Sequence, residues 1–431
     1  MKESVLKFEK SGAQFFFVSF FLFCLPFVPK ISVACLIVVS ILWLVSGVRI
    51  SYDVIKNDKK ILWFTAFYLV HLFGLLYTSN ISFGLFDLQI KIFFLLAPFI
   101  FSSFKFTEER FNKLAMFFVA GCTCGIFLCL FFAYHTFMTS QSFDEFYYMR
   151  YSHFLHPTYF SMYLNFAILF LSDNLIGKWN NYSVLKRTGV IFLCYLFFIN
   201  IILLSARTAE AAAFLSVLVF IVIKLRNEVN KAKKYIVSIL LLTSLFLIQF
   251  FFLNGLNRFS DVKTEIKMEQ IHSDKTKTNL SGAAQKQAPV DPDNSVNEHV
   301  RIWKYSFQLA MKNPLLGVGT GDIKDELINV YRENNFAPGI ERKLNSHNQF
   351  LNTFAALGLL GLISLVLIFY TGFRASIRNH SLIYLSFLLM IFLNSMTESI
   401  FEVQSGILFF VAFNMLFYIR TKSASTVSVT N

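Results

Sequence analysis

The chain has 431 residues, of which 55% are hydrophobic, 18% aromatic and only 15% charged. Soluble domains carry roughly 25% charged residues, so this composition excludes an ordinary water-soluble fold. A formal net charge of +13 would suggest a nucleic-acid surface on a soluble protein. In this chain its meaning depends on where the charges lie.

Twelve continuous apolar segments follow one another along the chain. Most approach the length of about 17–25 residues with which a helix crosses a bilayer. We expect them at residues 13–29, 31–50, 61–77, 85–104, 114–138, 158–176, 188–204, 209–223, 235–253, 348–372, 381–397 and 405–420. Strands of a membrane barrel alternate in polarity, whereas these runs are apolar throughout. The sequence therefore predicts an all-α polytopic membrane protein with about twelve transmembrane helices.

The positions of lysine and arginine favour one orientation of these helices. If the N-terminus is cytoplasmic, the basic residues gather in the cytoplasmic connections and tails, for example Lys60, Arg187 and Lys234. Cytoplasmic loops of membrane proteins carry an excess of such residues. We therefore expect both termini in the cytoplasm, and the positive charge is a signal of topology and not of nucleic-acid binding.

One connection is long and polar, and it divides the chain into three parts. Residues 1–253 hold helices one to nine, residues 254–347 form a loop expected on the periplasmic side, and residues 348–431 hold the last three helices and a cytoplasmic tail. The first part of the loop has the composition of a linker or surface segment. The second part is expected to form helices near 296–312 and 322–334.

The loop helix near 296–312 has apolar residues at helical spacing, and three glycines follow it. The spaced residues are Val300, Trp303, Phe307 and Met311. The glycines are Gly317, Gly319 and Gly321. No strand precedes them, so we interpret them as a loop that ends the helix and not as a nucleotide-binding fingerprint.

His347 is the strongest candidate for chemistry, because it opens helix ten on the expected outer face. Ser346 and Gln349 fit a capping box, which would place His347 in the first helical turn. The helix dipole disfavours an imidazolium there, leaving a neutral ring that can accept a proton. The alternative is a histidine that only caps the helix. Further along one face, Gly358 and Gly361 would let another helix pack closely.

Two arginines are expected on the same side of the membrane. Arg207 lies in the tight turn before helix eight, and Arg301 lies on the polar face of the loop helix together with Lys304. An ion pair between Arg207 and Glu210, and a solvated basic face around Arg301, are the simpler interpretations. An arginine fork matches phosphate oxygens in pairs, so the set would suit a substrate that carries a diphosphate.

Other candidate residues lie in two further outer segments. His156 precedes helix six, where it lines a substrate cleft or simply packs at the interface. Glu398 and Glu402 lie four residues apart on the last outer turn, where one of them orients a histidine or pairs with an arginine. No spacing typical of a metal site is present outside the membrane, and the centres of the predicted spans are nearly free of charge.

Together these motifs resemble the O-antigen ligase and Wzy-type polymerase superfamily of bacterial integral-membrane glycosyltransferases, which have a GT-C-like architecture. The resemblance rests on Arg301-x-Trp303-Lys304, on the run from Asn313 to Gly321, and on His347-Asn348 followed by Gly358-x-x-Gly361. The long outer loop between helices nine and ten, and an arginine before helix eight, agree with it.

The resemblance implies a metal-independent, inverting glycosyltransferase without a cofactor, located in the bacterial inner membrane with a periplasmic active face. Its donor would be a glycan on undecaprenyl diphosphate and its acceptor lipid A-core. By carry-over, Arg207 and Arg301 would bind the diphosphate, and His347 would act as general base. Substrate contacts are expected from Lys304, His156, Tyr159, Asn348 and Glu398.

Several alternatives stay open at this stage. A polymerase of lipid-linked repeats and a protein O-oligosaccharyltransferase use the same donor chemistry with another acceptor. A twelve-helix transporter belongs to a different class, which typically has charged or broken helices at the midplane and two related halves. The nearly charge-free span centres and the gathering of candidate residues on one face favour the transferase.

Overall fold

The computed structural model describes residues 2–46, 48–104, 107–226 and 295–427, and in these ranges it is helical without a β-strand. The α-helices are α1 (Lys2–Cys24), α2 (Pro29–Ser46), α3 (Val48–Asn57), α4 (Trp63–Gly74), α5 (Ile81–Ser102), α6 (Glu108–Ser140), α7 (Tyr148–Tyr151), α8 (Pro157–Gly177), α9 (Val184–Leu204), α10 (Arg207–Arg226), α12 (Ser295–Lys312), α13 (Ile323–Glu333), α14 (Ala337–Glu341), α15 (Gln349–Arg378), α16 (Leu382–Ser395) and α17 (Gln404–Val427). Short 3-10 segments are η1 (Lys59–Leu62), η2 (Leu75–Tyr77), η3 (Phe143–Phe146), η4 (Trp179–Asn181) and η6 (Ile400–Glu402).

The contacts divide the chain into two compact units. One comprises Met1–Asn227 and Ile302–Asn431, and the other comprises Glu228–Arg301. Of the second unit, the described residues are 295–301, the beginning of α12. The other described helices, and α12 from Ile302 onward, belong to the first unit.

Six helical segments of the described chain are long and apolar enough to cross a membrane. They are Lys59–Tyr77, Ile81–Ser102, Glu108–Ser140, Pro157–Gly177, Val184–Leu204 and Gln349–Arg378. Shorter apolar helices cover Gly12–Cys24, Pro29–Val45, Leu382–Ser395 and Gln404–Arg420. An all-α, multi-pass membrane protein is therefore confirmed. Eleven of the twelve expected spans coincide with helices; the ninth, 235–253, and the loop up to residue 294 lie outside the described residues, so the count of twelve stays a prediction.

Two helices, α8 and α17, are buried on nearly all sides. A helix that is hydrophobic all round belongs in an interior, and both sequences are of this kind. Lipid tails are as apolar as the side chains, so tight packing must hold such helices together. Here the packing is aromatic: a cluster of rings from α6, α8, α16 and α17 meets edge-to-face and in tilted pairs, made of Phe118, Phe166, Phe387, Phe409 and Phe413.

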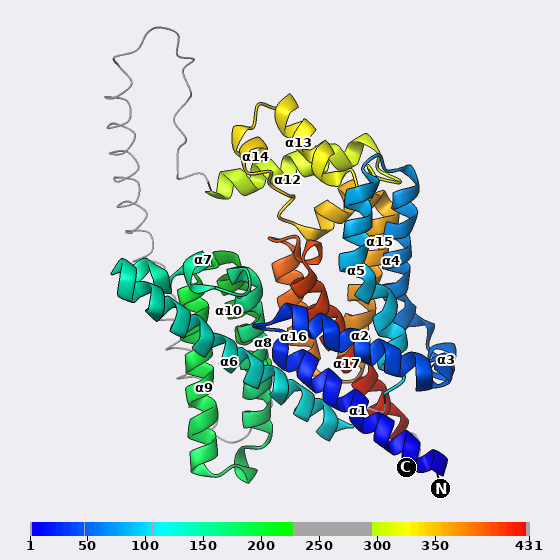
Figure 1. Ribbon diagram of the computed structural model, residues 1–431, viewed down its shortest axis with the longest axis vertical. Coiled ribbons are helices and arrows are strands. Elements are labelled where there is room, and N and C mark those ends of the chain that lie inside the picture. The colour runs from blue at the N-terminus through cyan, green and yellow to red at the C-terminus, as the bar shows by residue number, and fades with distance from the viewer. Residues whose placement is uncertain (1, 47, 105–106, 227–294, 428–431) are drawn as a thin grey trace. The chain divides into compact units, whose positions relative to one another are not determined.

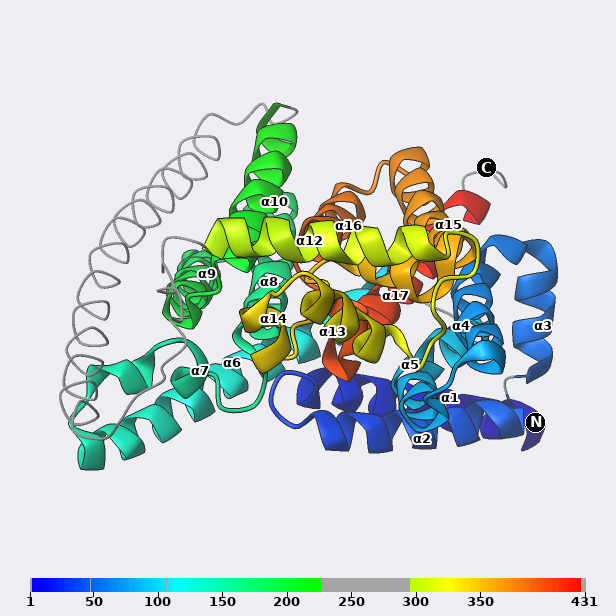
Figure 2. The same ribbon diagram turned by 90° about the horizontal axis from the view of Figure 1, so that it is seen from above.

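The segment 302–347, here called the loop subdomain, lies at the end of the helices where α4 ends and α15 begins (Figures 1 and 2). Its core joins α12 and α13 to the first turns of α15, and Ile340 of α14 packs against it. The buried members are Ile302, Tyr305, Leu309, Ala310, Ile323, Leu327, Val330, Tyr331, Phe336, Ala355, Ala356 and Leu357. The predicted helices at 296–312 and 322–334 are thus confirmed as α12 and α13.

The expected apolar stripe of α12 is not the face that packs. Phe307 and Met311 are 51% and 53% exposed, whereas Ile302, Tyr305 and Leu309 are buried. The helix carries two apolar faces, and spacing alone does not rank them. The face that includes Tyr305 is the buried one, because the ring of Tyr305 packs against the rings of Tyr331 and Phe336 in an aromatic cluster.

The loop subdomain is docked by a backbone junction on a kink in α15. At Gly358 the backbone leaves the helical region, with φ 61° and ψ −156°. The N–H of Leu359 donates to the carbonyl of Pro314 (2.8 Å), and the carbonyls of Ala355 and Ala356 accept from Val318 (3.0 Å) and Gly319 (2.9 Å). The run 314–319 therefore satisfies backbone groups that the kink takes out of the helix.

This junction corrects one expectation and confirms another. The glycine at 358 does not admit a neighbouring helix; it admits the backbone of the loop. An ideal Cβ at Gly358 would lie 2.3 Å from the carbonyl carbon and oxygen of Leu315. Gly317 and Gly319 have positive φ values of 70° and 104°, as expected for a loop that ends α12.

We expect Gly358→Ala to destabilise the protein strongly, because the backbone conformation is nearly restricted to glycine and the new methyl group would overlap Leu315. The backbone term alone is about 1–3 kcal/mol. Thermal unfolding of the purified protein in detergent measures it. The control is Gly189→Ala in α9, where a Cβ meets nothing within 4 Å. An unchanged unfolding temperature for Gly358→Ala would contradict the junction.

Candidate functional site

His347 does not lie in the first turn of α15, as the capping-box pattern predicts, but directly before the helix. The N-cap is Asn348, whose Oδ1 accepts from the backbone N–H groups of Phe350 (3.0 Å) and Leu351 (3.1 Å). Ser346 instead donates its hydroxyl to Asn352 Oδ1 at 3.2 Å. Asparagine and serine are comparable N-cap residues, and Asn348 is also held by the carbonyl of Met396. The dipole argument for a neutral His347 therefore loses its basis.

The backbone of His347 is held in an uncommon conformation from two sides. Its φ is 41°, in the left-handed region that histidine enters more readily than most residues. The N–H donates to Asn345 Oδ1 at 2.9 Å. The carbonyl accepts from the indole Nε1–H of Trp303 in α12 at 3.2 Å. The loop subdomain thus fixes the direction in which the histidine leaves the chain.

The ring of His347 faces Glu398, which lies between α16 and η6. Nδ1 is 3.5 Å from Glu398 Oε2, and the side chains are 25% and 17% exposed. Burial raises the pKa of Glu398, but the hydrogen bond and charge of His347, the charge of His156 and the N–H of Ser399 outweigh it, so the pKa is lowered. The carboxylate therefore stays ionised near neutral pH. Of the two glutamates of this turn, Glu398 lies beside a histidine, and its expected role of orienting that histidine stays a prediction.

His156 and Tyr159 lie together at the start of α8. His156 is the N-cap, its Nδ1 accepts from Thr158 N–H at 3.4 Å, and its ring centre is 6.1 Å from that of Tyr159. Partial burial lowers the pKa of His156 more than Glu398 raises it, and His347 lowers it further. His156 is exposed and therefore remains a candidate for substrate contact. Tyr159 is only 4% exposed, and in this conformation a substrate does not reach it.

The segment 396–402, here called the Glu398 turn, is attached to the start of α15 by two neighbouring side chains. Asn348 Nδ2 donates to the carbonyl of Met396 at 3.0 Å, and Gln349 Oε1 accepts from the N–H of Phe401 at 2.7 Å. Asn348 is buried, and its side chain makes three hydrogen bonds within the protein. In this structure it caps α15 and positions the turn, and it is not placed to contact a substrate.

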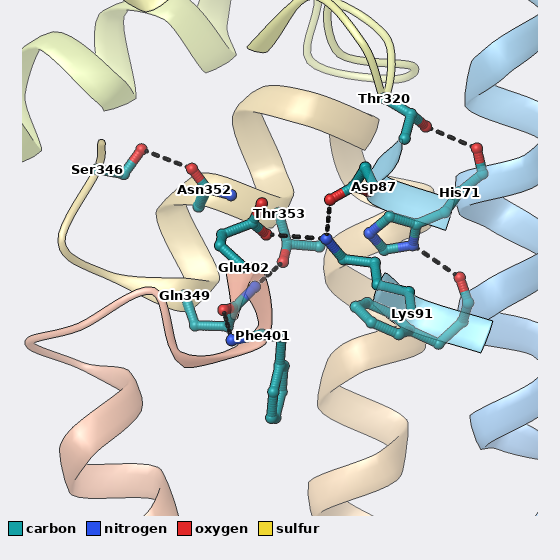
Figure 3. A network of polar contacts seen from close by, with 11 residues as sticks. His71, Asp87, Lys91, Thr320, Ser346, Gln349, Asn352, Thr353, Phe401 and Glu402 are labelled. Carbon is teal, nitrogen blue, oxygen red and sulfur yellow. Dashed lines mark hydrogen bonds and ion pairs between the residues drawn. The ribbon is translucent and has the colours of Figure 1, made fainter. Parts of the chain in front are cut away.

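A buried cluster of charges lies next to this turn (Figure 3). Lys91 of α5 is 1% exposed and pairs with Asp87, four residues earlier, and with Glu402 at 3.2 Å. His71 of α4 lies beside them, with its Nδ1 2.9 Å from the carbonyl of Phe67. The expectation of nearly charge-free spans is therefore wrong for α5.

Sequence reasoning missed this cluster although one signal was present. Asp87 and Lys91 stand at i and i+4 in an otherwise apolar helix, and ionisable residues in such segments are functional suspects. The third member, Glu402, was considered only as a partner for a histidine or an arginine. Its lysine partner lies more than three hundred positions away, and spacing gives no hint of it.

The remaining predicted residues lie on α10 and α12. Arg207 is the first residue of α10, and its side chain lies outside the described part. Arg301 belongs to the second compact unit and is exposed. Lys304 is exposed on α12. The structure thus brings together His347, Glu398 and His156, whereas the convergence of the two arginines on them stays a prediction.

Within the four described ranges, no group of three or more histidine, cysteine, aspartate or glutamate residues has an arrangement that would hold a metal ion.

Comparison with known proteins finds one similarity. Residues 192–366 match the family model described as O-antigen ligase. The match begins within α9 and ends within α15, so it includes Arg207, Arg301 and His347 but not Glu398. No curated protein matches the chain. This match confirms the resemblance to the O-antigen ligase and Wzy-type polymerase superfamily over residues 192–366 and supports glycosyl transfer in general.

We expect Trp303→Phe to lower kcat for glycosyl transfer about five- to tenfold, because it removes one neutral hydrogen bond, worth about 1 kcal/mol, while it keeps an aromatic ring against the loop core. Steady-state kinetics on purified protein measure it. Trp43→Phe is the matched control, since Trp43 donates to Ser51 Oγ at 2.8 Å and contacts none of the site residues. Equal rates for both variants would contradict a role for Trp303 in holding His347.

Proposed function

We propose that this protein transfers a glycan from undecaprenyl diphosphate to an acceptor hydroxyl at the periplasmic face of the bacterial inner membrane, with lipid A-core as acceptor. The observation that carries the proposal is the pair of His347, directly before α15, and Glu398, between α16 and η6, 3.5 Å apart. His347 lies inside the segment that matches the family. Both side chains are partly exposed, as residues that meet a substrate must be.

In the proposed reaction His347 is the general base. A proton on Nδ1, which faces Glu398, leaves the lone pair of the ring on Nε2. Nε2 takes the proton of the acceptor hydroxyl while the acceptor oxygen attacks the anomeric carbon. The bond from that carbon to the diphosphate oxygen breaks, and a single displacement inverts the configuration. The carboxylate of Glu398 stabilises the imidazolium that forms, as the aspartate of a catalytic triad does.

The leaving group is a diphosphate, and negative charge grows on its bridging oxygen during the displacement. Preorganised cations at that position lower the barrier, and no metal is needed where arginines supply them. We assign this role to Arg207 of α10 and Arg301 of α12, with Lys304 three residues after Arg301. We assign to His156 a contact with the acceptor, because its ring lies close enough to Glu398 for the charges of the two groups to affect each other's pKa.

The acceptor distinguishes ligase from polymerase and from protein O-oligosaccharyltransferase. All three use the same donor chemistry. Lipid A-core, a lipid-linked repeat and a serine-containing acceptor protein, offered in competition to purified enzyme, separate them: preferred modification of lipid A-core supports the ligase, and preferred elongation of the lipid-linked repeat would assign a polymerase.

We expect His347→Ala, Arg207→Ala and Arg301→Ala each to lose most of the transfer activity at wild-type abundance. A positioned general base contributes about 10²–10⁴-fold to the rate, and we expect His347→Ala to lower the transfer rate by a factor in this range. Conversion of lipid-linked donor into product is the measurement. Arg332→Ala is the control, an arginine of α13 whose Nη1 donates to Asn329 at 3.0 Å. Near-normal transfer by all three variants would remove the site assignment.

We expect Glu398→Gln to lower the plateau rate about tenfold and to move the acidic limb of the pH–rate profile to lower pH. The pKa of Glu398 lies below its ordinary value, so the carboxylate is ionised above about pH 5 and does not itself cause a limb between pH 5 and 8. Its removal withdraws stabilisation from the protonated base. A profile that coincides with that of the wild type would contradict this pairing; the exposed Glu333→Gln is the control.

A further inference from the structure

Lys91 is an unusual residue for a buried membrane helix. It is 1% exposed, and removing an ammonium group from water is costly unless partners compensate it. Asp87, on the same helix, already balances its charge. The second carboxylate, Glu402, comes from the other end of the chain and lies 3.2 Å away. A single partner would suffice for neutrality, so the second contact needs another explanation.

We propose that Lys91 acts through Glu402 as a positioning residue for the reaction: it holds the Glu398 turn at the depth where Glu398 meets His347. The inference rests on the proposed function of His347. Because Lys91 is closed off from solvent, it does not contact a substrate, and its effect must travel through the protein.

The path from Glu402 to Glu398 is short and stiff. The two residues are separated by one 3-10 turn, in which the N–H of Glu402 donates to the carbonyl of Ser399 at 3.1 Å. The backbone N–H of Phe401 donates to Oε1 of Gln349 in α15. Figure 3 shows Gln349, Phe401 and Glu402 close to one another. A shift at Glu402 is therefore transmitted to Glu398 and is not absorbed by a flexible loop.

The turn is held at three points, and only one of them is ionic. Met396 and Phe401 are bonded to Asn348 and Gln349 of α15. The third point, Glu402, is bonded to α5. This contact attaches the turn to α5, which packs against α4. It thereby fixes the distance between the turn and the start of α15. The contact between His347 and Glu398, at 3.5 Å, is at the upper limit of a hydrogen bond, so a displacement well under 1 Å decides whether it forms.

The surroundings of Glu402 favour this role. Burial raises the pKa of its carboxyl group, Lys91 lowers it, Asp87 raises it and His71 lowers it, and the sum is a raised pKa. Without Lys91 this carboxyl group would face Asp87 with no cation beside it. It would then move away from α5 or take up a proton, and in both cases the attachment of the turn to α5 is lost.

A double-mutant cycle tests the proposal. The variants are Lys91→Met, Glu398→Gln and the two together, with kcat and KM measured for donor and acceptor. If Lys91 acts through Glu398, Lys91→Met lowers kcat by up to about tenfold, no more than Glu398→Gln does, with KM within about twofold, and the double variant is no more than about twofold slower than Glu398→Gln alone. Losses that multiply, or a wild-type kcat for Lys91→Met, would overturn it.

Glu402→Gln keeps the test valid if Lys91→Met does not accumulate in the membrane. This change preserves shape and leaves Asp87 and Lys91 balanced, and it is expected to lower kcat in the same non-additive way with Glu398→Gln. Hydrogen exchange supplies a readout independent of activity: peptides that cover 396–403 exchange faster in both variants. Unchanged exchange there would overturn the proposal. Lys113→Met is the control, since Lys113 pairs with Glu109 four residues earlier at an exposed site.

The outcomes separate this inference from the proposed function. Normal transfer by His347→Ala and Glu398→Gln would remove the catalytic site itself, and the positioning role with it. Loss of transfer in those two variants, combined with independent losses at Lys91, would leave the proposed function standing and remove only the role of Lys91.

Discussion

The arrangement of the site depends on one backbone junction, the pairing of residues 314–319 with the kink of α15 at Gly358. In an apolar surrounding each backbone group needs a partner inside the protein, and a kink takes the bonds of Leu359, Ala355 and Ala356 out of the helix. The loop supplies all three partners. The kink is therefore stable only when the loop subdomain is docked, and the loop is placed only when the helix is kinked.

This mutual dependence determines where His347 points. Trp303 belongs to the docked subdomain and holds the carbonyl of His347, while Asn348 and Gln349 begin α15 and hold the Glu398 turn. The histidine is thus fixed from the loop side and its carboxylate partner from the helix side. Rigid support of both His347 and Glu398 keeps the ring in the orientation that the reaction needs, and a fixed orientation of the reacting groups raises the rate.

The sequence predicts the helices well and the long-range pairings poorly, for a physical reason. Continuous apolar runs reveal spans such as α5 and α15, because the bilayer sets their length. The motif around His347 and the family resemblance identify the histidine. Spacing does not identify the N-cap, because both Ser346 and Asn348 satisfy the local rule and the choice depends on Met396. Nor does it rank the two apolar faces of α12, or pair Lys91 with Glu402, since these outcomes depend on tertiary neighbours.

Glu398 and Glu402 illustrate how surroundings assign different roles to identical groups on one short turn. Glu398 is partly exposed beside His347, and its pKa is lowered, so it keeps its charge where a protonated base must be stabilised. Glu402 is exposed to a similar extent (20% against 17%), but it faces Lys91 and Asp87 and its pKa is raised, so its charge depends on a single cation. Carboxyl groups whose environments push their pKa values apart commonly divide the work of a site. In this turn Glu398 takes part in the chemistry and Glu402 attaches the turn to α5. A substitution of either residue therefore affects the contact between Glu398 and His347.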